Sequence, residues 1–189
     1  MSGGETVRNS VNLFPGIFLA SGLWILAVSP GELAAQEEPA PPGTGSAEAV
    51  VRDLYDLVTF PADTTPDWNR ARDLFLPAGV VILRTGGNES TVFSVEGWIQ
   101  DFVTFIEEAD VMATGFVERI VRTHAVEFGD IAHVWVLFEA EIPGGGRPPQ
   151  QGVDSFQLAK MDGRWLIASI LNEIPTPDRP VPEILREGG

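Results

Sequence analysis

The chain has 189 residues, 44% of them hydrophobic, and this length and composition suit one globular domain plus its termini. Its 27 acidic and 12 basic side chains give a formal net charge of −15, which argues against nucleic acid and anionic membrane surfaces as partners, because both attract clustered Lys and Arg. Cysteine is absent, which excludes disulfides, thiolate catalysis, Cys-ligated zinc and a lipid anchor on cysteine.

Residues 1–35 are expected to form a secretory signal. Arg8 gives a weakly positive start, an apolar run covers residues 13–28, and Leu33-Ala34-Ala35 supplies small residues before a cleavage point. An uncleaved N-terminal anchor is the alternative. In both cases we expect an exported domain, periplasmic or extracellular, with no membrane contact beyond this leader. Residues 36–45 are rich in Pro and Gly and have the composition of a flexible linker.

Three helices are predicted in the first half of the folded domain. Ser46 is a good N-cap for a first helix through residue 60, because apolar residues recur there at helical spacing. A second helix is expected over residues 67–75. The third should follow Ser94 and cover residues 95–108, with its large apolar side chains on one face.

Strands alternate with turns in the rest of the domain. Short strands are predicted at residues 80–85 and 91–93, before the third helix. After that helix, residues 116–128 and 131–142 should form a hairpin about Gly129-Asp130. One face of this hairpin carries His124, His133, Trp135 and Leu137. The other is the cleaner core face and carries Val121, Thr123, Ala125, Ala132, Val134, Val136, Phe138 and Ala140.

A second hairpin should join residues 150–161 to residues 164–173 through Asp162-Gly163, a pair of residues that suits a tight two-residue turn. Its register would place one carboxylate and one hydroxyl on an otherwise apolar face. The residues of that face are Asp154, Phe156, Leu158, Trp165, Ile167, Ser169 and Leu171. A buried Asp154 could bind a ligand, or it could simply be satisfied by Ser169, Tyr55 or backbone groups.

Helices gathered before an antiparallel sheet predict an α+β fold with the helices on one face of a curved sheet. We place this domain at residues 46–174. Residues 175–189 are expected to be a Pro-rich tail with little to pack. The two histidines are offset on their strands and lack a third ligand, so no metal site is predicted.

This order of elements resembles the nuclear-transport-factor-2-like superfamily, and within it the SnoaL-like branch that includes polyketide cyclases and ketosteroid isomerases. Between about Ala47 and Glu173, three segments carry the resemblance: DLFLPAGVVI, FGDIAHVWVLFEAE and GVDSFQLAKMDGRWLIASI. The resemblance implies a strongly curved antiparallel sheet and three N-terminal helices that form a cone, often with a ligand cavity inside. It also implies a homodimer through the outer sheet face, here His124, His133, Trp135 and Leu137.

The resemblance assigns roles to individual residues. Asp154 matches the acid with which ketosteroid isomerases donate a hydrogen bond to the substrate oxyanion, and Tyr55 lies near their second donor. Leu83 stands where they carry the general base. A hydrocarbon cannot accept a proton from carbon, so the isomerase chemistry does not transfer on that assignment.

We therefore expect an exported domain that binds a small hydrophobic or carbonyl-bearing molecule in an apolar cavity. The expected lining residues are Trp98, Phe102, Val136, Phe138, Phe156, Ser169 and Leu171. One alternative is an isomerase, cyclase or hydratase that uses Asp154 and Tyr55 without a cofactor. Another is a dimeric interaction domain with a filled core. A second titratable group facing the same cavity would favour the enzyme over the binding protein.

Overall fold

The computed structural model describes residues 43–186, so the expected leader and most of the expected linker lie outside the described residues. Its helices are α1 (Ala47–Val58), α2 (Trp68–Arg72) and α3 (Val95–Glu108), with short 3₁₀ turns η1 (Val111–Ala113) and η2 (Glu183–Leu185). The strands are β1 (Phe60–Pro61), β2 (Phe75–Gly86), β3 (Glu89–Ser94), β4 (Gly115–Phe128), β5 (Ile131–Glu141), β6 (Gln150–Met161) and β7 (Arg164–Glu173). Within the described part of the chain, no helix is long and apolar enough to cross a membrane.

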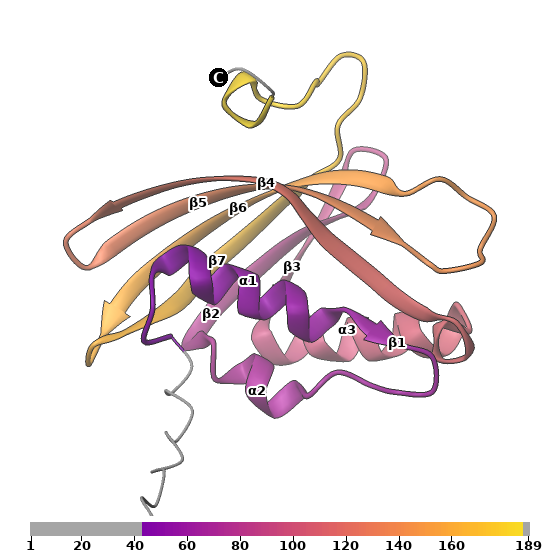
Figure 1. Cartoon of the computed structure of the whole chain (residues 1–189), viewed down its shortest axis with the longest axis horizontal. Coiled ribbons are helices and arrows are strands. Elements are labelled where there is room, and N and C mark those ends of the chain that lie inside the picture. Colours follow the sequence, from indigo (N-terminus) through magenta and orange to yellow (C-terminus); the bar gives the residue numbers. More distant parts are fainter. Residues whose placement is uncertain (1–42, 187–189) are drawn as a thin grey trace, which may run out of the picture. The chain divides into compact units, whose positions relative to one another are not determined.

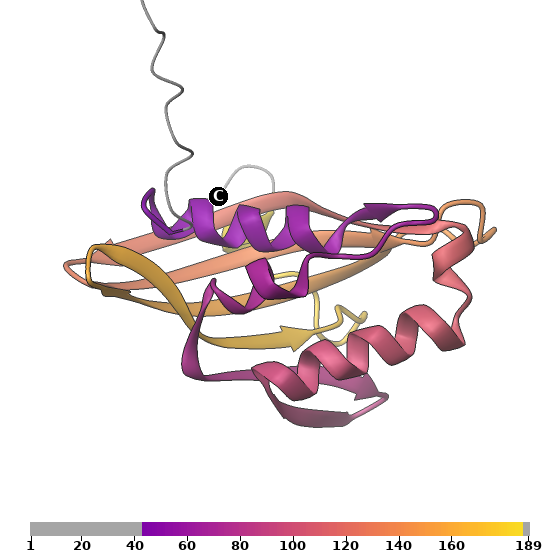
Figure 2. The ribbon, with the colours of Figure 1, turned by 90° about the horizontal axis from the view of Figure 1, so that it is seen from below.

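The strands form one curved sheet in the order β1-β4-β5-β6-β7-β2-β3. Neighbouring strands are antiparallel except β2 and β7, which are parallel. The three helices lie on one side of the sheet (Figure 1). In Figure 2, α1 runs beside the strands at one edge and α3 at the other; α1 packs mainly on β4 and α3 on β2. The predicted α+β fold is confirmed, and the middle of this inner sheet face lies between the two long helices.

Local sequence signals explain the helix ends. The side chains of Ser46 and Ser94 cap α1 and α3 as predicted, each accepting a hydrogen bond from a backbone N–H of the first turn. The second helix is shorter than predicted and ends at Arg72, because Phe75 already belongs to β2 and pairs with Ile167 of β7. Tertiary strand pairing therefore overrides the helical spacing of its last residues.

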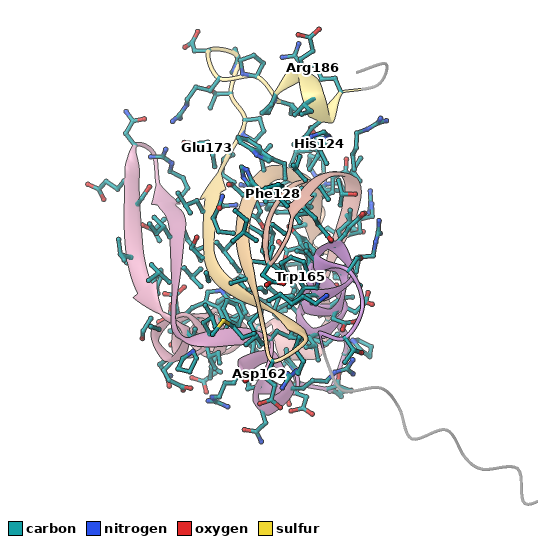
Figure 3. The ribbon with its side chains drawn as sticks, turned by 90° about the vertical axis from the view of Figure 1, so that its left-hand side faces the viewer. His124, Phe128, Asp162, Trp165, Glu173 and Arg186 are labelled. Carbon is teal, nitrogen blue, oxygen red and sulfur yellow. The ribbon has the colours of Figure 1, made fainter. Side chains whose placement is uncertain are left out.

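Both hairpin turns have the predicted register. Phe128 pairs with Ile131, and Met161 pairs with Arg164 across Asp162 and Gly163. The backbone φ angles of these two turn residues are 51° and 79°, in the left-handed region that such turns require. Figure 3 shows this turn at one end of β7 and Glu173 at the other.

Two β-bulges change the faces that were predicted further along these strands. At Ala168 the β6–β7 register shifts by one residue, so Ser169 pairs with Gln157 and Leu171 with Ser155. Ser169 and Leu171 were predicted to face the interior, and this is wrong: they lie on the outer face, where Leu171 is 44% exposed. A second bulge, at Val121 in β4, likewise removes that residue from the inner face.

The end of the described chain packs on the outer sheet face, so the prediction of a tail with little to pack is wrong for this segment. Leu185 is 1% exposed and packs in a small cluster with Leu137 and Val153; Val181 and Trp135 lie at its edge. Figure 1 shows this segment on the side of the sheet opposite the helices. Leu137, predicted to contact a second subunit, is thus covered by its own chain.

Candidate functional site

A cavity of about 210 Å³ lies between the inner sheet face and the helices. Among the predicted lining residues, Trp98, Phe102, Phe138 and Phe156 line it. Val136 is fully buried on the same face but belongs to the core beside the cavity. Because of the bulge in β7, Ile170 and Asn172 line the cavity in place of Ser169 and Leu171. The remaining lining residues are Leu54, Tyr55, Val58, Val81, Leu83, Arg84, Glu118, Asp154 and Ile174.

Asp154 is held by two donors inside this cavity. The Tyr55 hydroxyl donates to Oδ2 of Asp154 at 2.6 Å, and the Asn172 side-chain amide donates to Oδ1 at 2.7 Å. Tyr55 comes from the buried stripe of α1, and its ring packs at a tilt against Phe138 and Phe156. Asn172 lies directly across from Asp154 in the β6–β7 pair. The structure thus brings the two predicted site residues, Asp154 and Tyr55, together.

Burial and hydrogen bonding together set the pKa of Asp154. Burial raises the pKa of Asp154 to about 6, against the lowering effect of the bonds from Tyr55 and Asn172. Burial and the nearby carboxylate raise the pKa of the Tyr55 hydroxyl well above its ordinary value, so Tyr55 remains a donor. At neutral pH Asp154 is therefore mainly a carboxylate that accepts hydrogen bonds. The rise in the pKa of Asp154 has the direction that was expected from its burial, and in this structure each of its two oxygens accepts one hydrogen bond.

A second carboxyl group, Glu118 of β4, lines the same cavity. Burial, and to a lesser extent the charge of Asp154, raise the pKa of Glu118 to about 8. At neutral pH Glu118 is thus mainly a neutral acid that can donate a proton or a hydrogen bond. The Thr59 hydroxyl, at the C-cap of α1, accepts from the Glu118 backbone N–H and donates to its carbonyl, both at 2.9 Å. These two bonds fix this part of β4 against α1.

Sequence reasoning missed Glu118 because of the bulge at Val121. Strict alternation from the predicted inner residues Thr123 and Val121 points Glu118 outward. In the structure, the bulge restores Ile120 opposite Phe138 and Glu118 opposite Ala140 on the inner face. The available signal was local: Glu118 stands two residues from Phe116 and two from Ile120, so one face of this segment would be apolar apart from the carboxyl.

Arg84, which lines the cavity, belongs to an ion-pair network. The Arg84 guanidinium donates to both carboxylate oxygens of Glu173, and Glu173 also pairs with Arg179 at 3.2 Å. The pKa of Glu173 is lowered, chiefly by its bond from Arg84. The adjacent Leu83 lines the cavity, so a hydrocarbon does occupy the place that the resemblance assigns to a general base.

The residues predicted for a dimer contact lie on the outer face, away from the cavity. His124 is paired with Trp135, and His133 lies two residues before Trp135 in β5, on the same face. The His133 ring nitrogen is 2.9 Å from the Ser155 hydroxyl, and its ring lies 5.5 Å from that of Trp135. Among residues 43–186, no group of three or more His, Asp or Glu side chains is arranged to hold a metal ion.

Comparison with known proteins identifies the fold. No protein-family model matches the chain, and no curated protein matches it in sequence. Solved structures match most of it at low identity. An uncharacterised protein with a cystatin-like fold from Caulobacter vibrioides aligns with a TM-score of 0.55 and 16% identity, over 72% of this chain and 92% of its own.

Two other structures carry more specific descriptions. A nuclear-transport-factor-2-like protein of unknown function from Pseudomonas putida aligns with a TM-score of 0.54 and 10% identity, over 74% of this chain and 92% of its own. A candidate ketosteroid isomerase from Shewanella frigidimarina aligns with a TM-score of 0.51 and 16% identity, over 69% and 98%. At these identities the alignments establish the fold, and the described domain has the nuclear-transport-factor-2-like, cystatin-like fold that its sequence resembles.

Proposed function

We propose that this protein binds a small carbonyl-bearing molecule in the cavity and transfers protons on it, with Asp154 as the base and Glu118 as the acid. The observation that carries the proposal is that two carboxyl groups, a buried Asp154 and a half-buried Glu118, line one mostly apolar cavity, with pKa values near 6 and 8. When the surroundings of two titratable groups give them different pKa values, the group with the lower pKa can act as the base near neutral pH and the group with the higher pKa as the acid.

The reaction that fits this pair is isomerisation through an enol. The Asp154 carboxylate removes a proton from the carbon next to the carbonyl, while the Glu118 carboxylic acid donates its proton to the carbonyl oxygen. In a substrate with a double bond one carbon further from the carbonyl, the resulting dienol returns its oxygen-bound proton to Glu118. Asp154 delivers the carbon-derived proton to the far end of the original double bond, which shifts into conjugation with the carbonyl. Tyr55 positions Asp154 through its 2.6 Å hydrogen bond. The fold shared with a candidate ketosteroid isomerase is compatible with this chemistry but does not establish it.

The conversion of 3-cyclohexenone to 2-cyclohexenone tests the proposal, because only the product absorbs as a conjugated enone. We expect the protein to accelerate this conversion and Asp154→Asn to abolish the acceleration. Glu118→Gln should slow it by about 10²- to 10⁴-fold, the range for a general acid. Glu107→Gln, on the exposed face of α3, is the matched control and should behave as wild type.

Binding must be measured beside turnover, with 4-ethylphenol as the ligand. Equal binding by wild type and Asp154→Asn, without any acceleration, would overturn the enzyme and leave a binding protein. No binding and no acceleration would overturn both, and the interaction domain would then be the remaining interpretation.

We also propose that the protein forms homodimers through its outer sheet face. Support comes from three exposed apolar side chains at the β4–β5 end: Phe128 is 81% exposed, Ile131 61% and Val126 56%. They share the face of His133 and Trp135, beyond the part covered by Leu185. A contiguous exposed apolar patch of this kind is typical of an interaction site.

We further infer export with cleavage after the expected leader, which rests on the sequence of residues 1–35 alone. Mass spectrometry of the protein isolated from its own host should give a chain that begins near Gln36. An intact N-terminus on protein recovered from the cytoplasm would contradict this inference.

A further inference from the structure

A second cavity adjoins the one that holds the two carboxyl groups. It measures about 670 Å³ and lies between the C-terminal end of α3, the start of β4 and the loop that joins β5 to β6. Its apolar wall is formed mainly by Phe105, Phe116, Ala140 and Ile142. Its polar lining residues are Asp110, Thr114, Glu141, Arg147 and Gln150, so an anionic tail would meet two carboxylates there.

The two cavities are consecutive along the same strands. Phe138 of β5 lines both of them. Glu118 lines the inner cavity and is paired across the strands with Ala140, which lines the outer one. Phe116, two residues before Glu118 on the same face of β4, also lines the outer cavity. The Glu118 carboxyl therefore stands next to the junction of the two spaces, and Phe138 is part of the wall that separates them.

Gly152 provides the space that Phe138 occupies. The two residues are directly paired in the β5–β6 ladder, and a Cβ atom on Gly152 would lie only 2.1 Å from Cζ of Phe138. The ring thus lies over the bare backbone of Gly152, with the Tyr55 ring 5.9 Å away on the cavity side. Any other residue at position 152 would push the ring away from β6. The partition between the cavities consequently depends on one aromatic side chain and the glycine beneath it.

We propose that the ligand spans both cavities: an elongated molecule with one carbonyl or hydroxyl head group and a neutral apolar tail. The head group lies at Glu118 and Asp154, and the tail passes Phe138 into the outer cavity, along Phe105, Phe116 and Ile142. This assignment rests on the proposed function of the inner cavity and adds the shape and polarity of the ligand. Phe138 is then the residue that determines how long a ligand the site accepts.

A series of 4-alkylphenols, from ethyl to decyl, tests the assignment by calorimetric titration. If the tail enters the outer cavity, the dissociation constant should fall by about fourfold for each methylene added beyond butyl, as expected for burial of a CH₂ group. Ala140→Phe fills the outer cavity and should make the affinity independent of chain length beyond butyl. Ala78→Phe, at an exposed position of β2 that lines neither cavity, is the matched control and should retain the wild-type dependence.

An NMR measurement on the wild-type protein keeps the test independent of the folding of the variant. Addition of 4-octylphenol should shift the amide signals of Thr114 and Gly145 at the outer cavity, whereas 4-ethylphenol should not. An affinity that stops rising at butyl, with no shift at Thr114 or Gly145, would overturn the two-cavity ligand while the inner site stands. Failure of every phenol to bind, 4-ethylphenol included, would overturn the proposed function together with this inference.

Discussion

At the scale of single residues, the site depends on the different surroundings of two carboxyl groups. Tyr55 and Asn172 donate to Asp154 and partly offset the effect of its burial on the pKa. For Glu118, burial and the charge of Asp154 act in the same direction, and both raise its pKa. Asp154 therefore ionises first, and its charge makes ionisation of Glu118 still harder. At neutral pH the cavity therefore holds one negative charge, on Asp154, beside a neutral Glu118.

The first prediction concerns the pH dependence of stability. Because the pKa of Glu118 rises from 4.5 to about 8 on folding, the folded state binds the additional proton, and the free energy of unfolding falls as the pH rises between these values. The stability from this group is complete below pH 4.5 and is lost as the pH passes 8. Between these pH values the wild type should lose stability on the order of 2–4 kcal/mol through Glu118, and Glu118→Gln should not show this loss.

Urea denaturation at several values between pH 5 and pH 9 measures this difference. Glu107→Gln, which removes a carboxyl from the exposed face of α3, should keep the wild-type slope. If wild type and Glu118→Gln lose stability in parallel over this range, Glu118 does not have a raised pKa.

The second prediction concerns the hydrogen bond from Tyr55. A bond to a charged acceptor contributes about 1.5–3 kcal/mol, so Tyr55→Phe should lower the free energy of unfolding by about this amount at pH 8. The loss should be smaller at pH 4.5, where Asp154 is protonated and the bond is neutral. Carbon-13 NMR titration of the Asp154 carboxyl should also show a pKa above that of wild type. An unchanged pKa would mean that Tyr55 does not stabilise the carboxylate.

At the scale of elements, turn residues allowed more to be predicted than strand periodicity did. Asp162-Gly163 identified the β6–β7 turn and so placed Asp154 on the inner face. The bulges at Ala168 and Val121 could not be predicted, because no local residue preference there demands an extra residue; pairing across the whole sheet decides it. Each bulge reverses the side-chain alternation beyond it. The sequence thus predicted the fold and Asp154, but it missed Asn172 and Glu118.

The third prediction tests the contact between β5 and β6 at Phe138. Gly152→Ala should lower the free energy of unfolding by about 1–3 kcal/mol, because its Cβ overlaps the Phe138 ring and forces a shift in a packed interior. The backbone at Gly152 does not have a positive φ angle, so this loss is steric. In a Phe138→Ala background the same substitution should cost much less. Equal losses in the two backgrounds, measured by chemical denaturation, would show that the ring does not depend on this glycine.

At the scale of the whole molecule, one part of the outer sheet face is covered by the chain's own C-terminal segment and another part is exposed. Leu185 covers Leu137 and Val153, so the chain satisfies that part of the face by itself. The β4–β5 end remains exposed, with Phe128 and Ile131 paired across the turn. Trp135 borders the covered part, so a substitution there would disturb the C-terminal segment together with any dimer. A test of dimerisation therefore belongs at the hairpin end.

Phe128→Asp should convert a dimer into a monomer, because the charge would be buried against a second apolar surface without a partner. Analytical ultracentrifugation of the full chain measures this change. Each chain carries a formal charge of −15, so two copies repel each other and the wild-type dimer should tighten as salt rises towards 0.5 M and the repulsion is screened. Val92→Asp alters a side chain that is 66% exposed on β3, at the opposite end of the strand order, and should leave the association unchanged. A monomeric wild type at every salt concentration, or a Phe128→Asp variant that still dimerises, would exclude this face as the contact.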